Sequence, residues 1–316
     1  MVASITSNRN FNASTTGEEA ARALSSSIAG KTILVTGVTP GGLGAHFVKV
    51  VAAHQPKLLI LAGRSATKTR GRTLELDLSS QVNVRKAAAE VLFWQGPVDV
   101  LVNTAAVMGT PYEKTVDGIE MQFGTNHIGH FLFTNLIMRK LLESSTGPRV
   151  VNVSSAGHRR SDIRWDDVGF QDGKAYHKFR AYGQSKTANI LFSLELVQRL
   201  GSKGLQAFSL DPGAVPTNLS RYVVDGDGAA AKALDKEMGF KQGSDTFPYT
   251  WKNLTQGTAT HVVAAFDPKL DEHNGSYLKD CQLAPVDELQ PFAADKNSAT
   301  RLWKLSEELV GQSFVY

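Results

Sequence analysis

Short apolar runs of the kind that form buried strands alternate along this chain with longer segments of helical periodicity. The runs lie at 32–37, 57–63, 73–78, 98–106, 149–155, 205–213 and 275–280, and the helical candidates lie at 43–54, 80–95, 117–145, 178–200 and 256–266. Such alternation is typical of βαβ units, in which helices connect parallel strands. We therefore predict an α/β fold with a doubly wound, mainly parallel, seven-stranded sheet and helices on both faces.

The size of the chain and its long loops suggest one domain behind a separate N-terminal segment. With 316 residues, 42% of them hydrophobic, the chain can bury a large core. We expect a single domain over 31–316, preceded by an extension over 1–30 that is partly disordered and contains a short helix. Irregular segments at 157–177 and 214–250 follow the fifth and sixth strand runs. Because such loops build the ligand crevice of open α/β sheets, we expect them to bind the substrate.

Charge and hydropathy narrow the range of partners. The net charge is +4 and acidic residues are mixed with basic ones, so the chain has no basic block of the kind that binds nucleic acid. No apolar run approaches the roughly 20 residues of a membrane-spanning helix, and the N-terminus lacks the apolar core of a signal peptide. We therefore expect no nucleic-acid partner, no membrane span and a cytoplasmic location.

Cysteine and histidine residues give no metal-binding pattern. The single cysteine, Cys281, excludes an intrachain disulfide and a cysteine-based zinc site, and it suits a reducing compartment. His127, His130, His158 and His177 lack the spacing of a metal-binding motif. We expect these histidines to be structural or substrate-facing.

The stretch "TGVTPGGLG", at 36–44, leads from the first strand run into the first helical candidate. A strand, a glycine-rich turn and a helix N-terminus together bind phosphate groups, since free backbone N–H groups and the helix dipole point at the anion. The glycines at 37, 41, 42 and 44 match neither G-x-G-x-x-G nor TG-x-x-x-G-x-G in strict register, because the turn holds one extra residue. Taken alone, the stretch fits a phosphate loop and an ordinary turn equally well.

A tyrosine and a lysine lie four residues apart in "FRAYGQSKTANILF". Within a helix, Tyr182 and Lys186 project from the same face. An ammonium beside a phenol favours the phenolate and lowers the phenol pKa from about 10, which suits a general acid or base. Y-x-x-x-K alone is a weak signal, but "VVNVSS" places Ser154 and Ser155 at the end of a strand, where active sites lie in this architecture.

In chain order, the glycine turn, "LDL", "VNTAA", "TNHIGHF", "VVNVSS", "YGQSK" and "LDPGAVPT" resemble the motifs of the short-chain dehydrogenase/reductase family. The resemblance runs from about Lys31 to Cys281. The stretches "TNHIGHFLFTNLI", "NVSSAGH" and "SKTANILFSLELVQRL" are similar to the retinol-dehydrogenase-like and WW-domain-oxidoreductase-like enzymes. The family implies a Rossmann-type fold and an enzyme that interconverts a carbonyl and an alcohol by hydride transfer. The glycine turn then becomes a phosphate loop lengthened by one residue.

The resemblance also implies four catalytic residues. Tyr182 would be the acid or base, Ser155 would hydrogen-bond the substrate oxygen, and Ser154 would face the other side. Lys186 would bind the nicotinamide ribose and lower the Tyr182 pKa. Asn126, in "TNHIGHF", would distort its helix and hold a water of the proton relay.

The same resemblance implies the residues that bind the cofactor. They are Gly37, Thr39, Gly42, Leu43, Gly44, Arg64, Asp77, Leu78, Asn103, Ala105, Tyr182, Lys186, Pro212, Gly213, Val215 and Thr217. NADP(H) is favoured over NAD(H), because Arg64 follows the second strand where an NAD-binding protein carries an acidic residue. Lys68 and Arg70 follow in the same loop and are interpreted more simply as solvated cations.

The aromatic residues after the sixth strand bear on the substrate. Phe240, Phe247, Tyr249 and Trp251 suggest an apolar or ring-bearing carbonyl compound, although core packing explains at least half of them equally well. The family also implies a homodimer or homotetramer formed through the helices at 117–145 and 178–200.

Two other functions are compatible with parts of the pattern. A cofactor-binding regulatory protein would keep the fold without turnover, but it has no chemical need for all four catalytic residues. A sugar epimerase or dehydratase also uses Y-x-x-x-K, but it usually carries a strict G-x-x-G-x-x-G turn and a larger C-terminal substrate domain.

Overall fold

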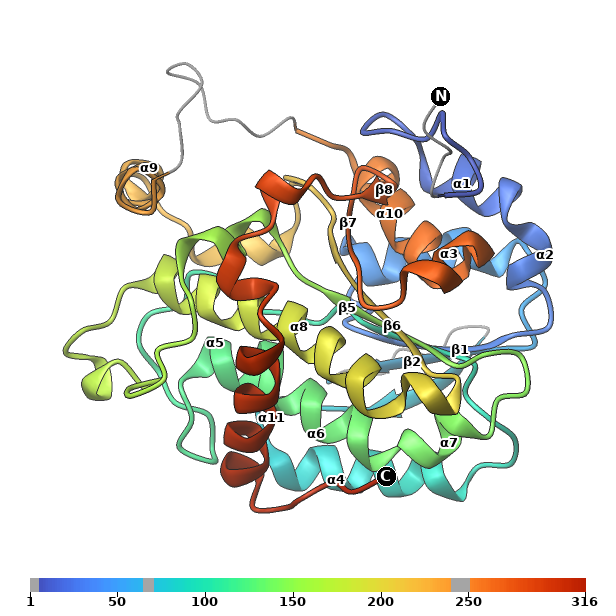
Figure 1. The fold of residues 1–316 in the computed structure, drawn as a ribbon, viewed down its shortest axis with the longest axis horizontal. Helices are drawn as coiled ribbons and strands as arrows, with labels where there is room; N and C mark the ends of the chain where they lie inside the picture. The colour runs from blue at the N-terminus through green and yellow to red at the C-terminus, as the bar shows by residue number, and fades with distance from the viewer. Residues whose placement is uncertain (1–5, 65–70, 240–250) are drawn as a thin grey trace.

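One sheet organises the part of the chain that the computed structural model describes, residues 6–64, 71–239 and 251–316 (Figure 1). The strands are β1 (Thr32–Thr36), β2 (Leu58–Gly63), β3 (Arg72–Glu75), β4 (Val100–Asn103), β5 (Arg149–Val153), β6 (Gln206–Asp211), β7 (Tyr277–Lys279) and β8 (Gln282–Leu283). Their order is β3-β2-β1-β4-β5-β6-β7-β8, and only the pair β7 and β8 is antiparallel. The predicted doubly wound sheet is confirmed. Each predicted run holds one strand, and the short edge strand β8 is an eighth.

Helices connect the strands and cover the sheet. In the described residues they are α1 (Gly17–Ala23), α2 (Ser25–Ile28), α3 (Leu43–Ala52), α4 (Gln81–Phe93), α5 (Met121–Phe123), α6 (Gly129–Leu136), α7 (Met138–Leu142), α8 (Lys178–Leu200), α9 (Asp227–Glu237), α10 (Leu254–Phe266) and α11 (Lys296–Val310). Four of the five predicted helices correspond to α3, α4, α8 and α10. Their ends differ from the predicted ends by two residues at most.

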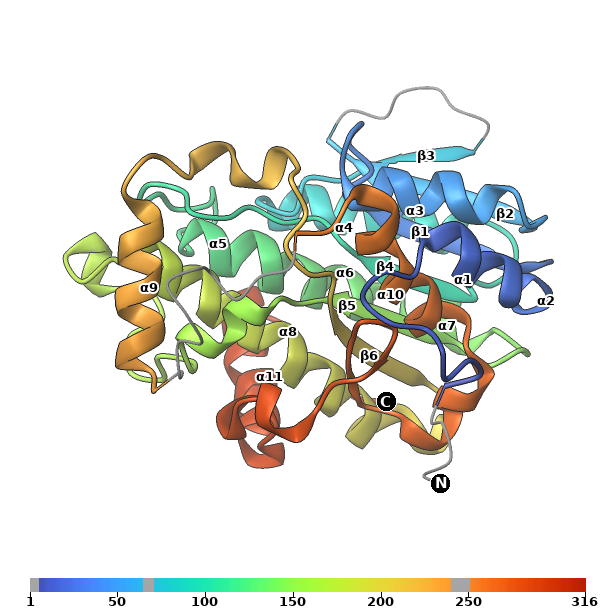
Figure 2. The ribbon, with the colours of Figure 1, turned by 90° about the horizontal axis from the view of Figure 1, so that it is seen from above.

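Two hydrophobic cores lie on opposite faces of the sheet, because successive residues of a strand point to opposite sides. In β1, Ile33 and Val35 belong to the core that includes residues of α1, α3 and α10. Leu34 belongs to the other core, with residues of α4, α6, α8 and α11. The central strands β1, β4 and β5 are buried throughout, as a parallel sheet with helices on both faces requires (Figures 1 and 2).

The segment 117–145 is not the single helix that its apolar pattern predicted. Gly118 has φ +81°, a left-handed conformation that interrupts a helix, and Glu120 caps the helix that begins one residue later. The helix then opens into a π-helical turn at Gly124–Ile128, resumes as α6 and breaks again at Ile137. The prediction was wrong because apolar periodicity reports burial and does not report how the backbone hydrogen bonds are arranged.

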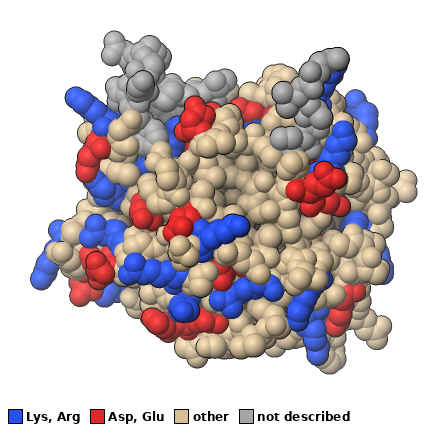
Figure 3. Space-filling model, in the orientation of Figure 1, with Lys and Arg blue, Asp and Glu red and all other residues tan. Residues whose placement is uncertain are grey.

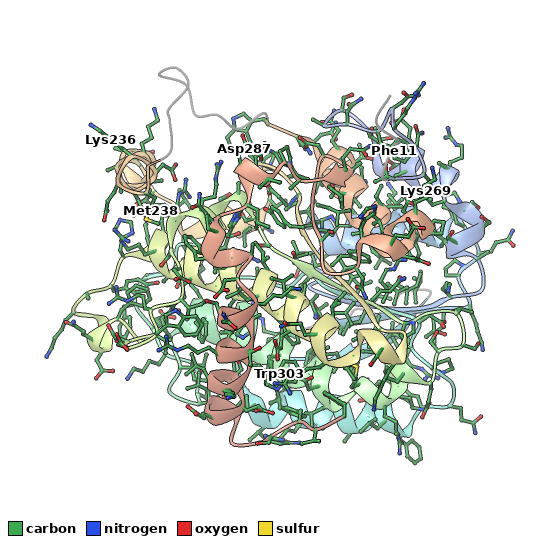
Figure 4. The ribbon with its side chains drawn as sticks, in the orientation of Figure 1. Phe11, Lys236, Met238, Lys269, Asp287 and Trp303 are labelled. Atoms are coloured by element: carbon green, nitrogen blue, oxygen red, sulfur yellow. The ribbon has the colours of Figure 1, made fainter. Side chains whose placement is uncertain are left out.

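The C-terminal helix α11 lies where the sequence predicted no element. Asp295 caps it by accepting the N–H groups of Asn297 and Ser298. Trp303 projects from α11 into the core and packs against Phe131 of α6 (Figure 4). The helix therefore covers α8 and the neighbouring end of α6.

The helix α9 lies inside the segment 214–250 that was expected to bind the substrate. Its apolar contacts are few and centre on Ala231 and Leu234, which pack against Phe179. Three ion pairs add to them: Lys178 with Asp227, Arg180 with Glu237, and Arg160 with Asp235. Because Lys178 and Arg180 lie in the first turn of α8 and Arg160 follows β5, these pairs tie α9 to the helix that carries Tyr182 and to the segment that carries Ser155. Lys236 projects from α9 away from the rest of the chain (Figure 4).

The N-terminal extension makes contacts with the rest of the chain from residue 6 onward, and its predicted start at 1–5 lies outside the described residues. Ser7 donates to Asp267 through its backbone N–H and its hydroxyl, over 2.8 and 2.6 Å. Phe11 is buried in the core that contains α10, and Thr6 donates to Gln282. These long-range contacts order a polar segment that has little helical or strand propensity of its own.

Charged side chains of both signs are interspersed over the face shown in Figure 3. Among the described residues, no helix combines the length and hydropathy that a membrane span requires.

Candidate active site

The carboxyl ends of β1, β4, β5 and β6 meet at one edge of the sheet, because these strands are parallel neighbours. The segments that follow Thr36, Asn103, Val153 and Asp211 therefore lie side by side. Ligand sites of open α/β sheets form at this edge. The predicted glycine loop and the predicted catalytic serine both lie there.

Two glycines of the loop allow backbone approaches that no other residue permits. Gly37 has φ +75°, and a Cβ atom there would lie 2.6 Å from Cα of Ala105. A Cβ atom on Gly44, in the first turn of α3, would lie 2.7 Å from the Gly37 carbonyl oxygen. The start of α3 is therefore packed directly against the end of β1, which is packed against the segment after β4.

The extra residue of the glycine loop is taken up by a turn between Thr39 and Gly42. The N–H of Gly42 donates to the Thr39 carbonyl oxygen over 3.0 Å, and Gly41 has φ +78°. Pro40 and Gly41 occupy the two positions at which a type II turn favours proline and glycine. Gly42 is the N-cap of α3 and provides no side-chain cap, so N–H groups of the first turn stay available to an anion.

Tyr182 and Lys186 project from the same face of α8. The Lys186 Nζ atom lies 5.6 Å from the centre of the Tyr182 ring and donates to the Val153 carbonyl oxygen over 2.9 Å. Both side chains are buried. Burial lowers the Lys186 pKa to about 7, because desolvation penalises the ammonium. Lys186 therefore places a buried amino group beside the phenol ring.

Ser155 follows β5 and lies in a turn that packs against Tyr182. Its hydroxyl oxygen accepts the Gly157 N–H over 3.0 Å. A Cβ atom on Gly157 would lie 2.9 Å from Cε1 of Tyr182, so glycine is needed for the turn to contact the ring. Ser154 is buried, and its hydroxyl donates to the backbone carbonyl oxygen of Lys186 over 2.8 Å. The two serines therefore differ: Ser154 anchors β5 to α8, whereas Ser155 lies beside Tyr182.

Asn126 lies in the π-helical turn and is fully buried. Its side chain bonds the backbone of Val107 twice, donating to the carbonyl oxygen over 2.9 Å and accepting the N–H over 2.8 Å. It also donates to the Ser185 hydroxyl over 2.9 Å, and Ser185 donates to the Tyr182 carbonyl oxygen over 2.8 Å. Asn126 thus connects the segment after β4 to the turn of α8 that carries Tyr182.

Asp77 and Leu78 lie in the turn between β3 and α4. Asp77 accepts the backbone N–H and the hydroxyl of Ser79 through one carboxylate oxygen. A Cβ atom on Gly129, the first residue of α6, would lie 2.4 Å from the Leu78 carbonyl oxygen. The turn is therefore held closely against the start of α6.

The Asn103 side chain does not line the cleft. Its amide donates to Thr134 of α6 over 3.1 Å and to Asn152 of β5 over 2.9 Å, and the residue is 1% exposed. The side chain therefore lies in the interior of the fold. Within the predicted segment, the part that faces Gly37 is the backbone near Ala105.

The segment after β6 is fixed by contacts from several elements. Gly213 follows Pro212 with φ +83°, and its N–H donates to Asp211 over 3.0 Å. A Cβ atom on Gly213 would lie 2.9 Å from Cδ of Lys252, whose buried side chain covers it. Thr217 caps the short 3-10 turn at Asn218–Tyr222.

Two segments that were predicted to bind the cofactor meet on α10, through Val215 of one and Leu43 of the other. A Cβ atom on Gly257 would lie 2.5 Å from Cγ2 of Val215 and 3.0 Å from Cδ2 of Leu43. The first turn of α3 and the segment after β6 therefore meet at Gly257.

Arg64 follows β2 directly and is exposed. Within the described residues no hydrogen bond or ion pair engages its guanidinium group. Lys68 and Arg70 lie outside the described residues, as do Phe240, Phe247 and Tyr249. Trp251 is 72% exposed and its backbone pairs with Ala214, next to the segment after β6.

The four histidines that were expected to be structural or substrate-facing lie in different parts of the fold. His127 and His130 are buried, and burial lowers their pKa values to about 3 and about 4. His158 is buried behind Ser155, its Nδ1 lying 2.8 Å from the Ser155 carbonyl oxygen. His177 caps α8 by accepting the N–H of Arg180. Of the four, only His158 and His177 lie within the segment 157–177.

A buried carboxylate that was not predicted from the sequence also lies at the site. Asp211, the last residue of β6, is buried and accepts the N–H groups of Ala156 and Gly213. Burial raises its pKa because desolvation penalises the carboxylate. It joins the residue after Ser155 to the segment after β6, and its place directly before "PG" was the only available signal.

These features fit a dinucleotide cofactor. Gly37 and Gly44 form a close-packed turn whose space any side chain would fill, and α3 begins without a side-chain cap. Arg64 offers a cation at the neighbouring strand end. An anionic cofactor would therefore lie across the ends of β1 and β4, with Tyr182 and Ser155 on its far side.

The sequence is similar to known dehydrogenases over most of its length. Residues 31–166 match the family model described as short chain dehydrogenase. The chain is 37% identical over 305 residues to the short-chain dehydrogenase/reductase prx1 of Penicillium roqueforti, which covers 90% of this chain and 86% of that protein. It is 35% identical over 304 residues to retinol dehydrogenase 14 of Mus musculus, covering 89% and 86%.

A solved structure shares most of the fold. The crystal structure of an uncharacterized protein from Mycobacterium paratuberculosis superposes with a TM-score of 0.68 at 30% sequence identity. The match covers 92% of this chain and 96% of that one. The similarity therefore extends well beyond the family model's 31–166.

Proposed function

Because the chain belongs to the short-chain dehydrogenase/reductase family, within its retinol-dehydrogenase-like subgroup, we propose that it is an NADP(H)-dependent oxidoreductase. It interconverts a ketone or aldehyde and the corresponding alcohol. The observation that carries the proposal is the packing of Tyr182 against the Ser155 turn, with the Lys186 ammonium beside the ring.

Tyr182 is the acid in carbonyl reduction and the base in alcohol oxidation. In reduction its hydroxyl proton moves to the substrate oxygen, and the Ser155 hydroxyl stabilises the negative charge that develops on that oxygen. Lys186, whose pKa is lowered to about 7, favours the phenolate while it carries its proton. Asn126 holds the turn of α8 that carries Tyr182 through its bond to Ser185.

When bound, NADP(H) supplies or accepts the hydride. The N-terminus of α3, which has no side-chain cap, would hold its pyrophosphate, and the segment after β6 would cover the nicotinamide. Arg64 is exposed directly after β2 and would bind the 2′-phosphate, and this position of a cation supports NADP(H) over NAD(H). Lys186 would hold the nicotinamide ribose.

The proposed substrate is an apolar or ring-bearing carbonyl compound. Val223 lies against Gly109, where a Cβ atom would be 3.5 Å from its Cγ2, and both Val224 and Trp251 are more than 60% exposed. Apolar side chains thus border the segments that follow β4 and β6. The retinol dehydrogenase named among the relatives is in keeping with a substrate of this class.

Assembly and location complete the proposal. α11 packs along α8 and α4 along α6, so α6 and α8 are partly covered within one chain. We propose a homodimer or homotetramer that forms through the surfaces of 117–145 and 178–200 that α4 and α11 leave free, and light scattering measures its mass. We propose a cytoplasmic location on the basis of the single, buried thiol of Cys281, and cell fractionation tests it.

The test of the function is turnover by the purified protein with NADPH and a panel of ketones, aldehydes and quinones. We expect loss of reduced-nicotinamide absorbance with some of them, and Tyr182→Phe should abolish it while NADPH still binds. Tyr316→Phe is the matched control, because the Tyr316 hydroxyl bonds Asn135 in the core and is remote from the strand ends. Tight NADPH binding without turnover on any compound would instead indicate a regulatory protein.

A further inference from the structure

His130 lies between the glycine loop and the π-helical turn. Its Nε2 atom is 2.9 Å from Oγ1 of Thr36, the last residue of β1. Its Nδ1 atom is 3.0 Å from the backbone carbonyl oxygen of Asn126. All three residues are 1% exposed or less, so water does not substitute for either contact.

The hydrogen-bond partners of Thr36 fix the position of the His130 proton. The Thr36 hydroxyl oxygen accepts the N–H groups of Thr104 and Ala105 over 3.0 and 3.1 Å. A hydroxyl has two acceptor positions and one hydrogen, so both acceptor positions are used and the hydrogen is donated to Nε2 of His130. His130 therefore carries its own proton on Nδ1 and donates it to the Asn126 carbonyl oxygen. The low pKa of this imidazole, about 4, keeps it neutral across the physiological range.

The same line of contacts continues to the catalytic helix. Beyond the Asn126 carbonyl, the Asn126 side chain donates to Ser185, and Ser185 donates to the Tyr182 carbonyl oxygen. An unbroken series of buried hydrogen bonds thus runs from the segment after β4, through Thr36 and His130, to the turn that carries Tyr182. These hydrogen bonds therefore connect β1, the π-helical turn and α8, which are far apart in the sequence.

We propose that His130 is a positioning residue for the reaction: as a neutral imidazole protonated on Nδ1, it holds the Asn126 carbonyl and couples the cofactor-binding turn to the helix of Tyr182. The catalytic part of this inference rests on the proposed function. The structural part rests only on the buried contacts. His130 touches neither substrate nor cofactor and acts through Thr36 and Asn126.

His127, three residues earlier, provides the contrast. It is equally buried, but its Nε2 atom lies 2.9 Å from the Ser306 hydroxyl of α11, and that hydroxyl donates its hydrogen to Leu302. His127 therefore donates from Nε2, the opposite tautomer, and its bond leads away from the strand ends. The two histidines share a segment and a degree of burial and differ in what they connect.

The first experiment uses the wild-type chain and needs no turnover. Nitrogen-15 spectra of the labelled imidazoles report which ring nitrogen carries the proton. We expect Nδ1–H for His130 and Nε2–H for His127, with the assignment made by loss of the signals in each variant. An Nε2–H tautomer at His130 would overturn the proposal.

The second experiment compares variants by kcat, by the KM for the carbonyl substrate and by the NADPH dissociation constant. His130→Leu removes both bonds. We expect kcat to fall about 10- to 100-fold through displacement of the catalytic turn. The NADPH dissociation constant should rise about three- to tenfold, as loss of one buried hydrogen bond implies, with the substrate KM within about twofold. His127→Leu should lower stability comparably while both NADPH binding and kcat stay within about twofold of the wild type.

A conservative variant separates the two bonds of His130. Asn135, also in α6, donates its side-chain amide to the carbonyl oxygen of Phe131 four residues earlier, over 2.9 Å. His130→Asn can make the same bond to Asn126 but is too short to reach Thr36. We expect it to recover most of the kcat lost in His130→Leu while NADPH binding stays weak, a split that a purely structural role would not produce.

The outcomes separate the two hypotheses. Wild-type turnover together with normal kcat and normal NADPH binding in His130→Leu would overturn the positioning role and leave the proposed function intact. Absence of wild-type turnover would overturn the proposed function, and the NADPH dissociation constants and imidazole spectra would still decide whether His130 links Thr36 to Asn126.

Discussion

Gly37 and Gly41 have the same backbone conformation in different surroundings, which permits a controlled test of the glycine loop. Their φ angles are +75° and +78°. A Cβ atom on Gly37 would lie 2.6 and 2.7 Å from backbone atoms of Ala105, whereas nothing lies within 4 Å of a Cβ atom on Gly41. Alanine at either position incurs the left-handed strain, but only alanine at Gly37 also forces two strand ends apart.

The expected energies follow from these two terms. Left-handed strain for alanine amounts to about 1–2 kcal/mol, which is the whole loss for Gly41→Ala. Forcing an atom into closely packed backbone adds about 1–3 kcal/mol, so Gly37→Ala should lose about 2–5 kcal/mol in total. The difference of about 1–3 kcal/mol between the variants measures the contact between β1 and the segment after β4.

Urea titration followed by fluorescence measures both free energies of unfolding, and titration with NADPH measures cofactor binding. We expect the larger loss of stability and the larger loss of NADPH affinity in Gly37→Ala. Equal losses of stability in the two variants would refute the reasoning, because the strain term alone would then account for both.

Two further predictions concern charge. Arg64→Asp should weaken NADPH binding by about tenfold or more while leaving NADH binding within about threefold, as loss of a charge-assisted contact to the 2′-phosphate implies; an equal loss for both would place that contact elsewhere. The second uses the Lys186 pKa, which is about 7 in the folded chain and lower than in the unfolded chain. The unfolded chain therefore binds more protons between about pH 7 and 10, so the Lys186 contribution to stability rises with pH in that range. Urea midpoints should rise more from pH 7.5 to pH 9.5 in the wild type than in Lys186→Met, and parallel changes would contradict the shifted pKa.

Local patterns predicted the elements of the sheet and most of its helices. α8 begins and ends at the predicted residues, since its apolar period is regular and Gly201 follows it. β8 was not predicted, because a strand of two residues is too short to show an alternation of apolar and polar side chains. α11 was missed although Asp295 is a good N-cap, because its burial of Trp303 depends on a distant partner, α8.

The sequence predicted those site residues that lie together in one helix, one strand or one motif. Spacing within a helix gave Tyr182 and Lys186. The bond between His130 and Thr36 joins residues 94 positions apart, so no periodicity or motif could report it. Asn103 was predicted from its motif to bind the cofactor. Strand alternation instead directs its side chain into the core.

The glycine loop explains why counting glycines left the sequence undecided. The constraints that matter are the approach of Gly44 to the Gly37 carbonyl and of Gly37 to Ala105, and both are contacts in space. Pro40 and Gly41 form a turn directed into open space, so an added residue lengthens the loop without moving the start of α3 away from β1. A sequence motif that requires a fixed spacing of glycines does not match this loop, although the loop keeps the geometry that the motif represents. The requirement for glycine is thus better expressed as two close backbone approaches than as a count of residues.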